Sequence, residues 1–379
     1  MKLTVANRIT GGFAIILVLL LLIGGMAYLN FQEVQKETIQ AKEVSIPAQQ
    51  LSNKLQNQLM AIQRFSLFEF YSDNITNLDD FHRQLTDSTK RFNQELLQLK
   101  QISAKDPKLL EQMSTIGSSI NTIIDDTEQL YQSKKATISY QNDLANKLSQ
   151  FTDTADDFSS LLLDITDLED DNNQSALDTV IGMAGDLDNS TLTLLQTNED
   201  VAKQTTVSKT DAVAKELKFV TGDLESKLTF MISRADGIFE QDLVNQLESQ
   251  YQQLLSYVSG PGSVHQNRVN LLRQIDVTNK LAITTKERID NASTIVDTLL
   301  NAASQSASDS QTQVLEKVTS SKTQITILVL IAIVFAVTIS LRTVSSIITP
   351  LNKINKLLTV LASGDLTQSV EQNSNDEFG

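Results

Sequence analysis

Residues 9–29 read ITGGFAIILVLLLLIGGMAYL and residues 323–341 read TQITILVLIAIVFAVTISL. Neither stretch contains a charged residue. At a rise of about 1.5 Å per residue, each is long enough to cross a hydrocarbon layer of roughly 30 Å. The alternatives are a cleaved signal peptide for the first and a buried core helix for the second. The first is long for a signal peptide and no A-x-A motif follows it, and the second is too apolar for a soluble bundle. The sequence therefore predicts two membrane-spanning helices.

The charges that flank the two spans predict their orientation. Basic residues precede the first span and follow the second, and the positive-inside rule places such segments in the cytoplasm: Lys2, Arg8, Arg342, Lys353 and Lys356. The chain as a whole is acidic, with a net charge of −15, and it has no cysteine. An acidic, cysteine-free outer domain fits the periplasm. We expect a bacterial inner-membrane protein with residues 1–8 inside, 9–29 as the first span, 30–322 outside, 323–341 as the second span and 342–379 inside.

The segment between the spans has the spacing of bundle helices. Apolar residues recur at alternating steps of four and three, as in a coiled-coil seam, and small or hydroxyl residues fill some of the seam positions. With 13 Gly and 4 Pro in 379 residues, turn residues are too few for a strand-rich fold. The sequence predicts an all-α fold. The seams are Leu78, Phe81, Leu85, Ser88, Phe92; Leu109, Met113, Ile116, Ile120, Ile123, Thr127, Leu130; and Leu271, Ile275, Thr278, Ala282, Thr285, Ile289, Ala292, Val296, Leu299, Ala303.

Turn signals divide this segment into helices. Breaks are expected at 72–74, at Asp106-Pro107, at 170–173 and at 260–262. The expected helices are 31–71, 77–102, 107 to about 168, 175 to about 205, about 208–257 and 264–322. Because two of them are about 60 residues long and the helix at 77–102 covers less than half of that height, we expect two stacked four-helix modules that share the long helices. If 260–262 forms the tip, the third helix is too long and should break near Thr152-Asp153, and the fifth should break near Asp236-Gly237.

Several function classes are disfavoured by composition. Nucleic-acid binding relies on clustered Lys and Arg, which this acidic chain lacks. The sequence has no glycine-rich phosphate loop, no GxSxG and no HExxH, and its only histidines are His82 and His265. An acidic stretch over 153–171 lacks the glycine and the alternating spacing of a calcium loop, so a solvated helix face is the simpler interpretation. We therefore predict no enzyme, no catalytic residue, no metal site and no cofactor.

The residues after the second span resemble a HAMP signal converter. Pro350 is followed by Leu351, Ile354, Leu357, Leu358 and Leu361, then by Gly364-Asp365-Leu366 and, nine residues later, by Asp376-Glu377-Phe378-Gly379. In HAMP domains a proline opens the first helix and a D-E-hydrophobic-G motif opens the second. An amphipathic helix directly after a span can pack with its dimer mate and pass on shifts of that span.

The whole arrangement resembles methyl-accepting chemotaxis receptors with a periplasmic helical bimodular sensor domain. This resemblance implies a homodimeric chemoreceptor whose ligand is a small molecule, with a carboxylate as the expected ligand class. The receptor would signal through HAMP to a cytoplasmic kinase and its adaptor. Two alternatives stay open. The same parts would serve a membrane histidine kinase, and a periplasmic binding protein could deliver the ligand. A purely structural bundle would not explain the HAMP motifs.

The candidate ligand site comes from the two membrane-anchored ends of the domain. Arg64 lies 35 residues from Leu29 and Arg288 lies 37 residues from Ile325, so the two arginines share a level to within about 3 Å. Guanidinium groups bind carboxylates bidentately, and in the resembled family this module is implied to bind organic acids.

The remaining candidates are Thr285, at a core position beside Arg288, and Arg91 on the second helix. Arg268 is the candidate for a second site farther along the domain. The alternative is that these arginines are structural and pair with neighbouring carboxylates, for which the candidates are Asp125, Asp126, Glu69 and Glu287.

Overall fold

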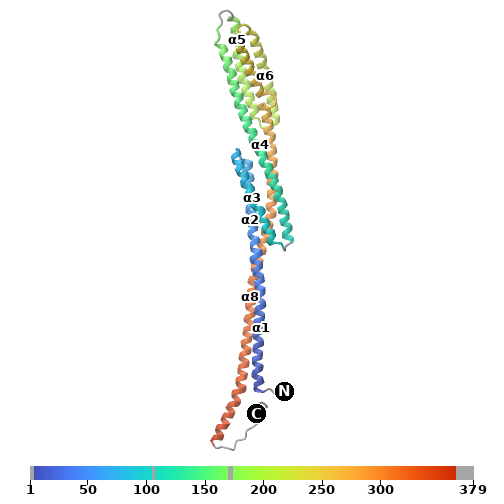
Figure 1. The fold of residues 1–379 in the computed structure, drawn as a ribbon, viewed down its shortest axis with the longest axis vertical. Coiled ribbons are helices and arrows are strands. Elements are labelled where there is room, and N and C mark those ends of the chain that lie inside the picture. Colours follow the sequence, from blue (N-terminus) through green and yellow to red (C-terminus); the bar gives the residue numbers. More distant parts are fainter. Residues whose placement is uncertain (1–3, 105–106, 170–173, 364–379) are drawn as a thin grey trace. The chain divides into compact units, whose positions relative to one another are not determined.

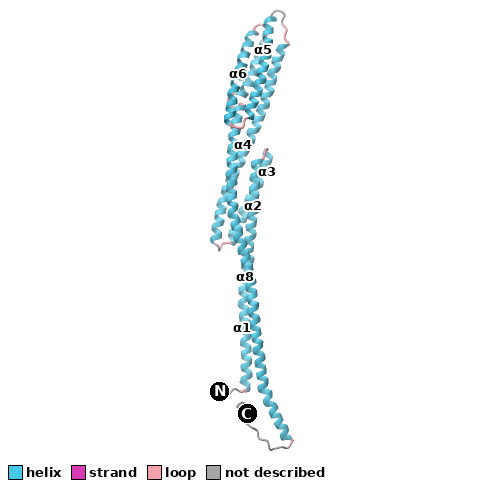
Figure 2. Cartoon of the chain, turned by 180° about the vertical axis from the view of Figure 1, so that it is seen from behind, coloured by secondary structure: helices cyan, strands magenta, loops and turns pink. Residues whose placement is uncertain are grey.

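The structure is a computed structural model that describes residues 4–104, 107–169 and 174–363. Within these ranges the chain is made of helices and short connections, without a strand, which confirms the all-α prediction (Figure 2). The helices are α1 (Val5–Gln40), the π-helical segment η1 (Ala41–Ser45), α2 (Ile46–Tyr71), α3 (Ile75–Ile102), α4 (Pro107–Thr166), α5 (Gln174–Lys203), α6 (Val207–Arg234), α7 (Gln241–Val258) and α8 (Val264–Ala362).

The chain divides into two compact units. The terminal unit comprises Met1–Asn53, Gln98–Pro107 and Thr298–Gly379, and the central unit comprises Lys54–Leu97 and Lys108–Asp297. Helices α2, α3, α4 and α8 contribute residues to both.

In the terminal unit, α1 and the second half of α8 lie side by side (Figure 1). Their apolar windows have a mean hydropathy of 2.6, and only 6% and 0% of the residues in those windows are buried. Both helices are therefore long and apolar enough to span a membrane, and they are too exposed to be the core helices of a soluble bundle. At Gly12 the two helices are so close that a Cβ atom would lie 2.6 Å from Ile339 Cγ2, as small residues permit between spanning helices.

A π-helical turn separates α1 from α2. Pro47 has no N–H, so an α-helix passing through it loses a backbone hydrogen bond. In this turn Ile46 N–H instead donates to Ala41 O, five residues back, which is the widened hydrogen bonding of a π-bulge. The bulge directs the buried Ser45 hydroxyl at Ser310 of α8, 2.9 Å away.

The central unit contains a bundle of α2, α3, the first half of α4 and α8, called here the α2–α3 bundle. The expected seam residues fill its core. Large side chains that are almost fully buried include Leu55, Ile62, Leu78, Phe92, Met113, Ile116, Ile120, Ile123 and Ile289. Phe68 of α2 packs against Phe81 of α3, with 5.2 Å between the ring centroids. Most of the predicted seam positions are thus confirmed as core positions, whereas Phe81, Leu109, Ile275 and Ala282 are half-buried.

A second bundle in the central unit joins the second half of α4 to α5, α6, α7 and the start of α8, and is called the α5–α6 bundle (Figure 1). Its core is one continuous cluster that includes Phe151, Phe158, Leu187, Leu224 and Leu254.

The predicted break of the third helix near Thr152-Asp153 is wrong, because α4 is one helix from Pro107 to Thr166. The reason is that 260–262 is not the tip. Gly262 lies beside Lys147 of α4, where a Cβ atom on Gly262 would be 3.6 Å from Lys147 Nζ. Helix α4 runs on past this turn, and α5, α6 and α7 cover its extension.

The other predicted turns have visible local causes. Asn74 Oδ1 accepts from Asn77 N–H at 2.8 Å and caps α3. The break near Asp236-Gly237 is confirmed, with Gly237 at φ 81° between α6 and α7, and Gly260 and Gly262 adopt φ of 87° and 88°, values that favour glycine. Asp106 and residues 170–173 lie outside the described residues.

The segment after the second span departs from the HAMP expectation in one respect. No helix begins at Pro350, because α8 continues through it to Ala362. Leu351, Ile354, Leu358 and Leu361 are exposed along this part of the helix. Gly364-Asp365-Leu366 and residues 376–379 lie outside the described residues.

Candidate functional site

Arg288 of α8 is bound to a carboxylate of α4. Its Nη1 donates to both carboxylate oxygens of Asp126, each at 2.6 Å. The Asp126 side chain is 10% exposed and that of Arg288 is 44% exposed. One of the carboxylates named as a structural partner therefore does hold this arginine. The other guanidinium nitrogens, Nε and Nη2, have no acceptor among the described residues.

Arg64 lies at the same level of the α2–α3 bundle but does not meet Arg288. Gln63, its neighbour on α2, donates to Asp290 of α8 at 2.9 Å, and Asp290 follows Arg288 by two residues. The Arg64 side chain is exposed, and its guanidinium lies 4.8 Å from the ring centroid of Phe65. Within one chain the two arginines thus share a height and face different directions.

Thr285 is buried one turn before Arg288 on α8. Its hydroxyl is fully inaccessible and has no hydrogen-bond partner among the described residues. A buried hydroxyl without a partner costs free energy. The candidate site thus contains a buried hydroxyl without a hydrogen-bond partner among the described residues, at Thr285, one turn from the half-exposed side chain of Arg288.

The two remaining arginines have separate surroundings. Arg91 is exposed on α3 one turn before Glu95, whose pKa is raised by burial and lowered in part by the charges of Lys54 and Arg91. Arg268 is half-buried near the start of α8, and its Nε donates to the backbone carbonyl of Gln204, just beyond α5, at 2.8 Å. Burial lowers the pKa of Arg268. Its observed contact fixes a helix end.

An apolar groove of about 340 Å³ opens beside the candidate site, between α2 and α8 with one residue of α4. Its apolar wall includes Leu67, Phe70, Leu130 and Ile283. At its polar edge, Lys286 Nζ lies 2.5 Å from Asp290 Oδ2, and Gln63 holds the other oxygen of the same carboxylate. A ligand with an apolar body and a polar group would fit such a lining.

Polar side chains also fix the antiparallel register of α2 and α8. In the central unit Gln56 donates to Asp297 at 2.7 Å and Gln63 donates to Asp290 at 2.9 Å. In the terminal unit Gln49 donates to Ser304 at 3.1 Å. These contacts recur every seven residues on both helices, which is the repeat of a coiled-coil seam.

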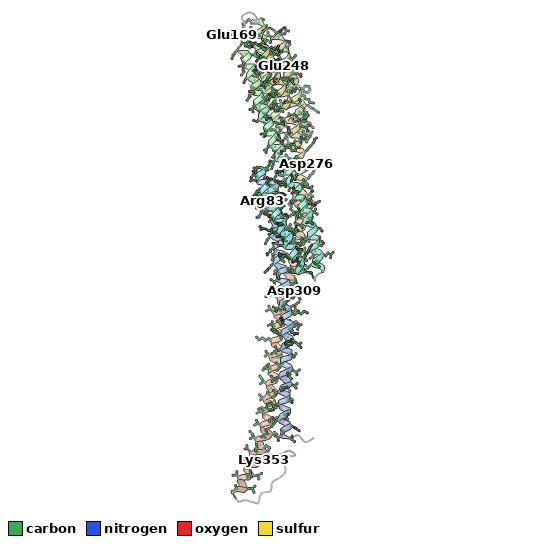
Figure 3. All side chains as sticks on the ribbon, viewed as in Figure 1. Arg83, Glu169, Glu248, Asp276, Asp309 and Lys353 are labelled. Carbon is green, nitrogen blue, oxygen red and sulfur yellow. The ribbon has the colours of Figure 1, made fainter. Side chains whose placement is uncertain are left out.

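One charged cluster was not foreseen from the sequence. His82 of α3 contacts Glu69 of α2 and Glu128 of α4 and stacks on Tyr131. Arg83, labelled in Figure 3, is the next residue of α3 and pairs at the surface with Asp80. The sequence held one signal, since Glu69 follows Phe65 and Ile62 on the buried face of α2, where a carboxylate needs a partner.

No family model matches the chain, and no curated protein matches it. Several solved chains are similar, and two of them are described here. The first is the sensor domain of the V. parahaemolyticus histidine kinase sensor TorS, with a TM-score of 0.46, 12% identity, and coverage of 67% of this chain and 99% of that one. The second is a complex of the TorS sensor domain with TorT in the presence of TMAO, with a TM-score of 0.46, 14% identity, and coverage of 68% and 98%.

Proposed function

We propose that this chain acts as a bacterial inner-membrane chemoreceptor. Residues 30–322 would sense a small organic acid in the periplasm, and residues 342–379 would pass the signal through a HAMP converter to a cytoplasmic kinase and its adaptor. The observation that carries the proposal is α8, one helix that contains Thr285, Arg288 and the second apolar stretch. A change at Arg288 is thereby connected, without a break in the helix, to a segment suited to cross a membrane.

Arg288 has the free donors that a carboxylate ligand needs. Because Asp126 takes only Nη1, the Nε and Nη2 edge can bind a second carboxylate in the bidentate manner. The Thr285 hydroxyl, one turn away, is buried without a partner among the described residues, so it could donate to a ligand only if binding opens the helix packing around it. Arg64 faces outward beside the exposed Met60 and Leu67 of α2, so we propose that it acts at the homodimer contact.

Calorimetry on the full chain in nanodiscs tests this proposal. A panel of organic acids is screened first, and the acid that binds is titrated into Arg288→Ala, Arg288→Lys, Arg64→Ala and the control Arg273→Ala. Arg273 is exposed on the same helix and forms no ion pair among the described residues. We expect the first three variants to lose at least tenfold in affinity, because lysine keeps the charge without the planar fork. Arg273→Ala should bind normally.

The panel also separates direct sensing from the two alternatives. If no acid binds the purified chain, the organic-acid proposal fails and a binding protein becomes the candidate partner. If Arg64→Ala and Arg288→Ala both bind normally, the site lies elsewhere and the arginines are structural. The choice between a chemoreceptor and a histidine kinase is tested by incubating the protein expressed from its own gene with labelled ATP, since a histidine kinase takes up phosphate by itself and a chemoreceptor does not.

A further inference from the structure

His82 stands between carboxylates from two other helices. Its Nδ1 lies 2.9 Å from Glu69 Oε1 of α2, and its Nε2 lies 3.3 Å from Glu128 Oε2 of α4. The ring stacks on Tyr131 of α4, with 4.0 Å between centroids and 20° between planes. Three helices of the α2–α3 bundle therefore meet at one imidazole.

This geometry is satisfied by the imidazolium form. A neutral imidazole has one N–H and one lone pair, so either tautomer leaves a ring nitrogen lone pair directed at a carboxylate oxygen. With both nitrogens protonated, the ring donates a hydrogen bond to Glu69 and forms an ion pair with Glu128. The proton is thus part of the contact between α2, α3 and α4.

The surrounding charges favour the same proton. Glu69 is fully buried and its Oε2 has no partner among the described residues, and burial raises the pKa of its carboxyl group. Asp79 of α3 accepts from Tyr131 Oη at 2.7 Å, and Lys135 of α4 lies 3.8 Å from Asp79. Three carboxylates therefore face one lysine and the histidine.

The pKa of His82 is raised first by its hydrogen bond to Glu69, against the opposing effect of burial. The charges of Glu69, Glu128 and Asp79 raise it further.

We infer that His82 is a proton-binding site of this domain, and that its proton holds α3 against α2 and α4, so that the packing of α3 depends on external pH. This site is separate from the organic-acid site, and neither depends on the other. Because the bound species is a proton, the site can lie within a contact between helices and does not require a cavity.

The sign of the pH effect follows from the two raised pKa values. A group whose pKa is higher in the folded than in the unfolded state stabilises the fold fully below its unfolded pKa, and that stabilisation is lost as pH rises through the folded pKa. His82 and Glu69 act in the same direction. The bundle should therefore lose stability as pH rises above the ordinary histidine range of about 6.5.

The test compares thermal unfolding of the full chain in nanodiscs, followed by circular dichroism between pH 5.5 and 9.5. His82→Gln removes the titrating group. His265→Gln is the matched control, because His265 also faces a carboxylate, Asp211, but through one nitrogen only at 2.8 Å. We expect Tm to fall with rising pH in the wild type and in His265→Gln, and to fall less steeply above about pH 6.5 in His82→Gln, where Glu69 is the remaining group of the pair. A wild type with a flat profile, or a His82→Gln variant that keeps the wild-type slope, overturns the inference.

A second measurement covers the case in which His82→Gln does not fold. The chain has two histidines, so a ¹³C-histidine label gives two ring signals that a single variant assigns. The His82 signal should titrate above the ordinary value of about 6.5, and Glu128→Gln should lower that midpoint by removing the second carboxylate. A midpoint at or below the ordinary value, or one unaffected by Glu128→Gln, contradicts the site.

Discussion

Thr285 is the residue whose substitution separates a binding role from a structural one. Valine has nearly the same shape and no hydroxyl. Because the Thr285 hydroxyl is buried without a partner among the described residues, we expect Thr285→Val to leave the free energy of unfolding unchanged or to raise it by about 1 kcal/mol. If the hydroxyl donates to the ligand, the same variant should bind the organic acid about tenfold more weakly. Denaturant unfolding and calorimetry measure the two effects.

The opposite pattern would be as informative. A loss of 2 or more kcal/mol, an amount on the order of a buried hydrogen bond left unmade, would mean that Thr285 is hydrogen-bonded in the folded protein. Thr278, on the same helix, is the matched control. Its hydroxyl lies 2.8 Å from Ser133 Oγ and 2.9 Å from Thr137 Oγ1, so Thr278→Val should destabilise the fold.

At the same residue scale, helical rise predicts heights better than directions. Counting from the two spans placed Arg64 and Arg288 at one level, and the contact between Gln63 and Asp290 shows that level directly. The count could not reveal that Arg288 turns to Asp126, because the partner comes from α4, a helix with a register of its own. The same limit hid His82, whose two carboxylates come from helices on either side of α3 in the sequence.

At the scale of helices, the register of the chain beside the π-turn can be tested with a disulfide. The native chain has no cysteine, so every bond observed is engineered. Because the Ser45 and Ser310 hydroxyls lie 2.9 Å apart, Ser45→Cys with Ser310→Cys should crosslink readily under mild oxidation. Ser45→Cys with Ser308→Cys is the control, since Ser308 is exposed. Gel mobility before and after reduction reports the bond, and equal crosslinking of the two pairs would refute the register.

Helix type and core faces followed from the sequence, whereas the connection between the helices did not. Seam spacing identified Ile116, Ile120 and Ile123 as core positions because periodicity is a local property. The supposed break of α4 came from a global assumption, that residues 260–262 form the tip. Turn-forming residues such as those at 260–262 mark where a helix ends in the sequence. They do not show beside which part of a neighbouring helix, here α4, the turn lies.

At the scale of the whole molecule, the proposed topology makes residues 30–322 accessible from outside the membrane and residues 342–379 accessible from inside. Asn74, Ser259 and Ser363 are exposed, so single cysteines there should be reactive wherever reagent can reach. On intact spheroplasts an impermeant thiol reagent should label Asn74→Cys and Ser259→Cys and spare Ser363→Cys. All three should label after permeabilisation, and labelling of Ser363→Cys on intact cells would reverse the orientation.

The contacts between α2 and α8 restrict how this molecule can move. Gln56 with Asp297 and Gln63 with Asp290 are spaced by the same seven residues on both helices, so sliding one helix along the other misaligns both pairs together. The next offset at which such pairs could meet again is about 10 Å away. Sliding of α2 along α8 can therefore be continuous only over the fraction of an ångström by which a hydrogen bond can lengthen. Beyond that range it becomes cooperative, and the two helices would pass between discrete settings rather than through a continuum.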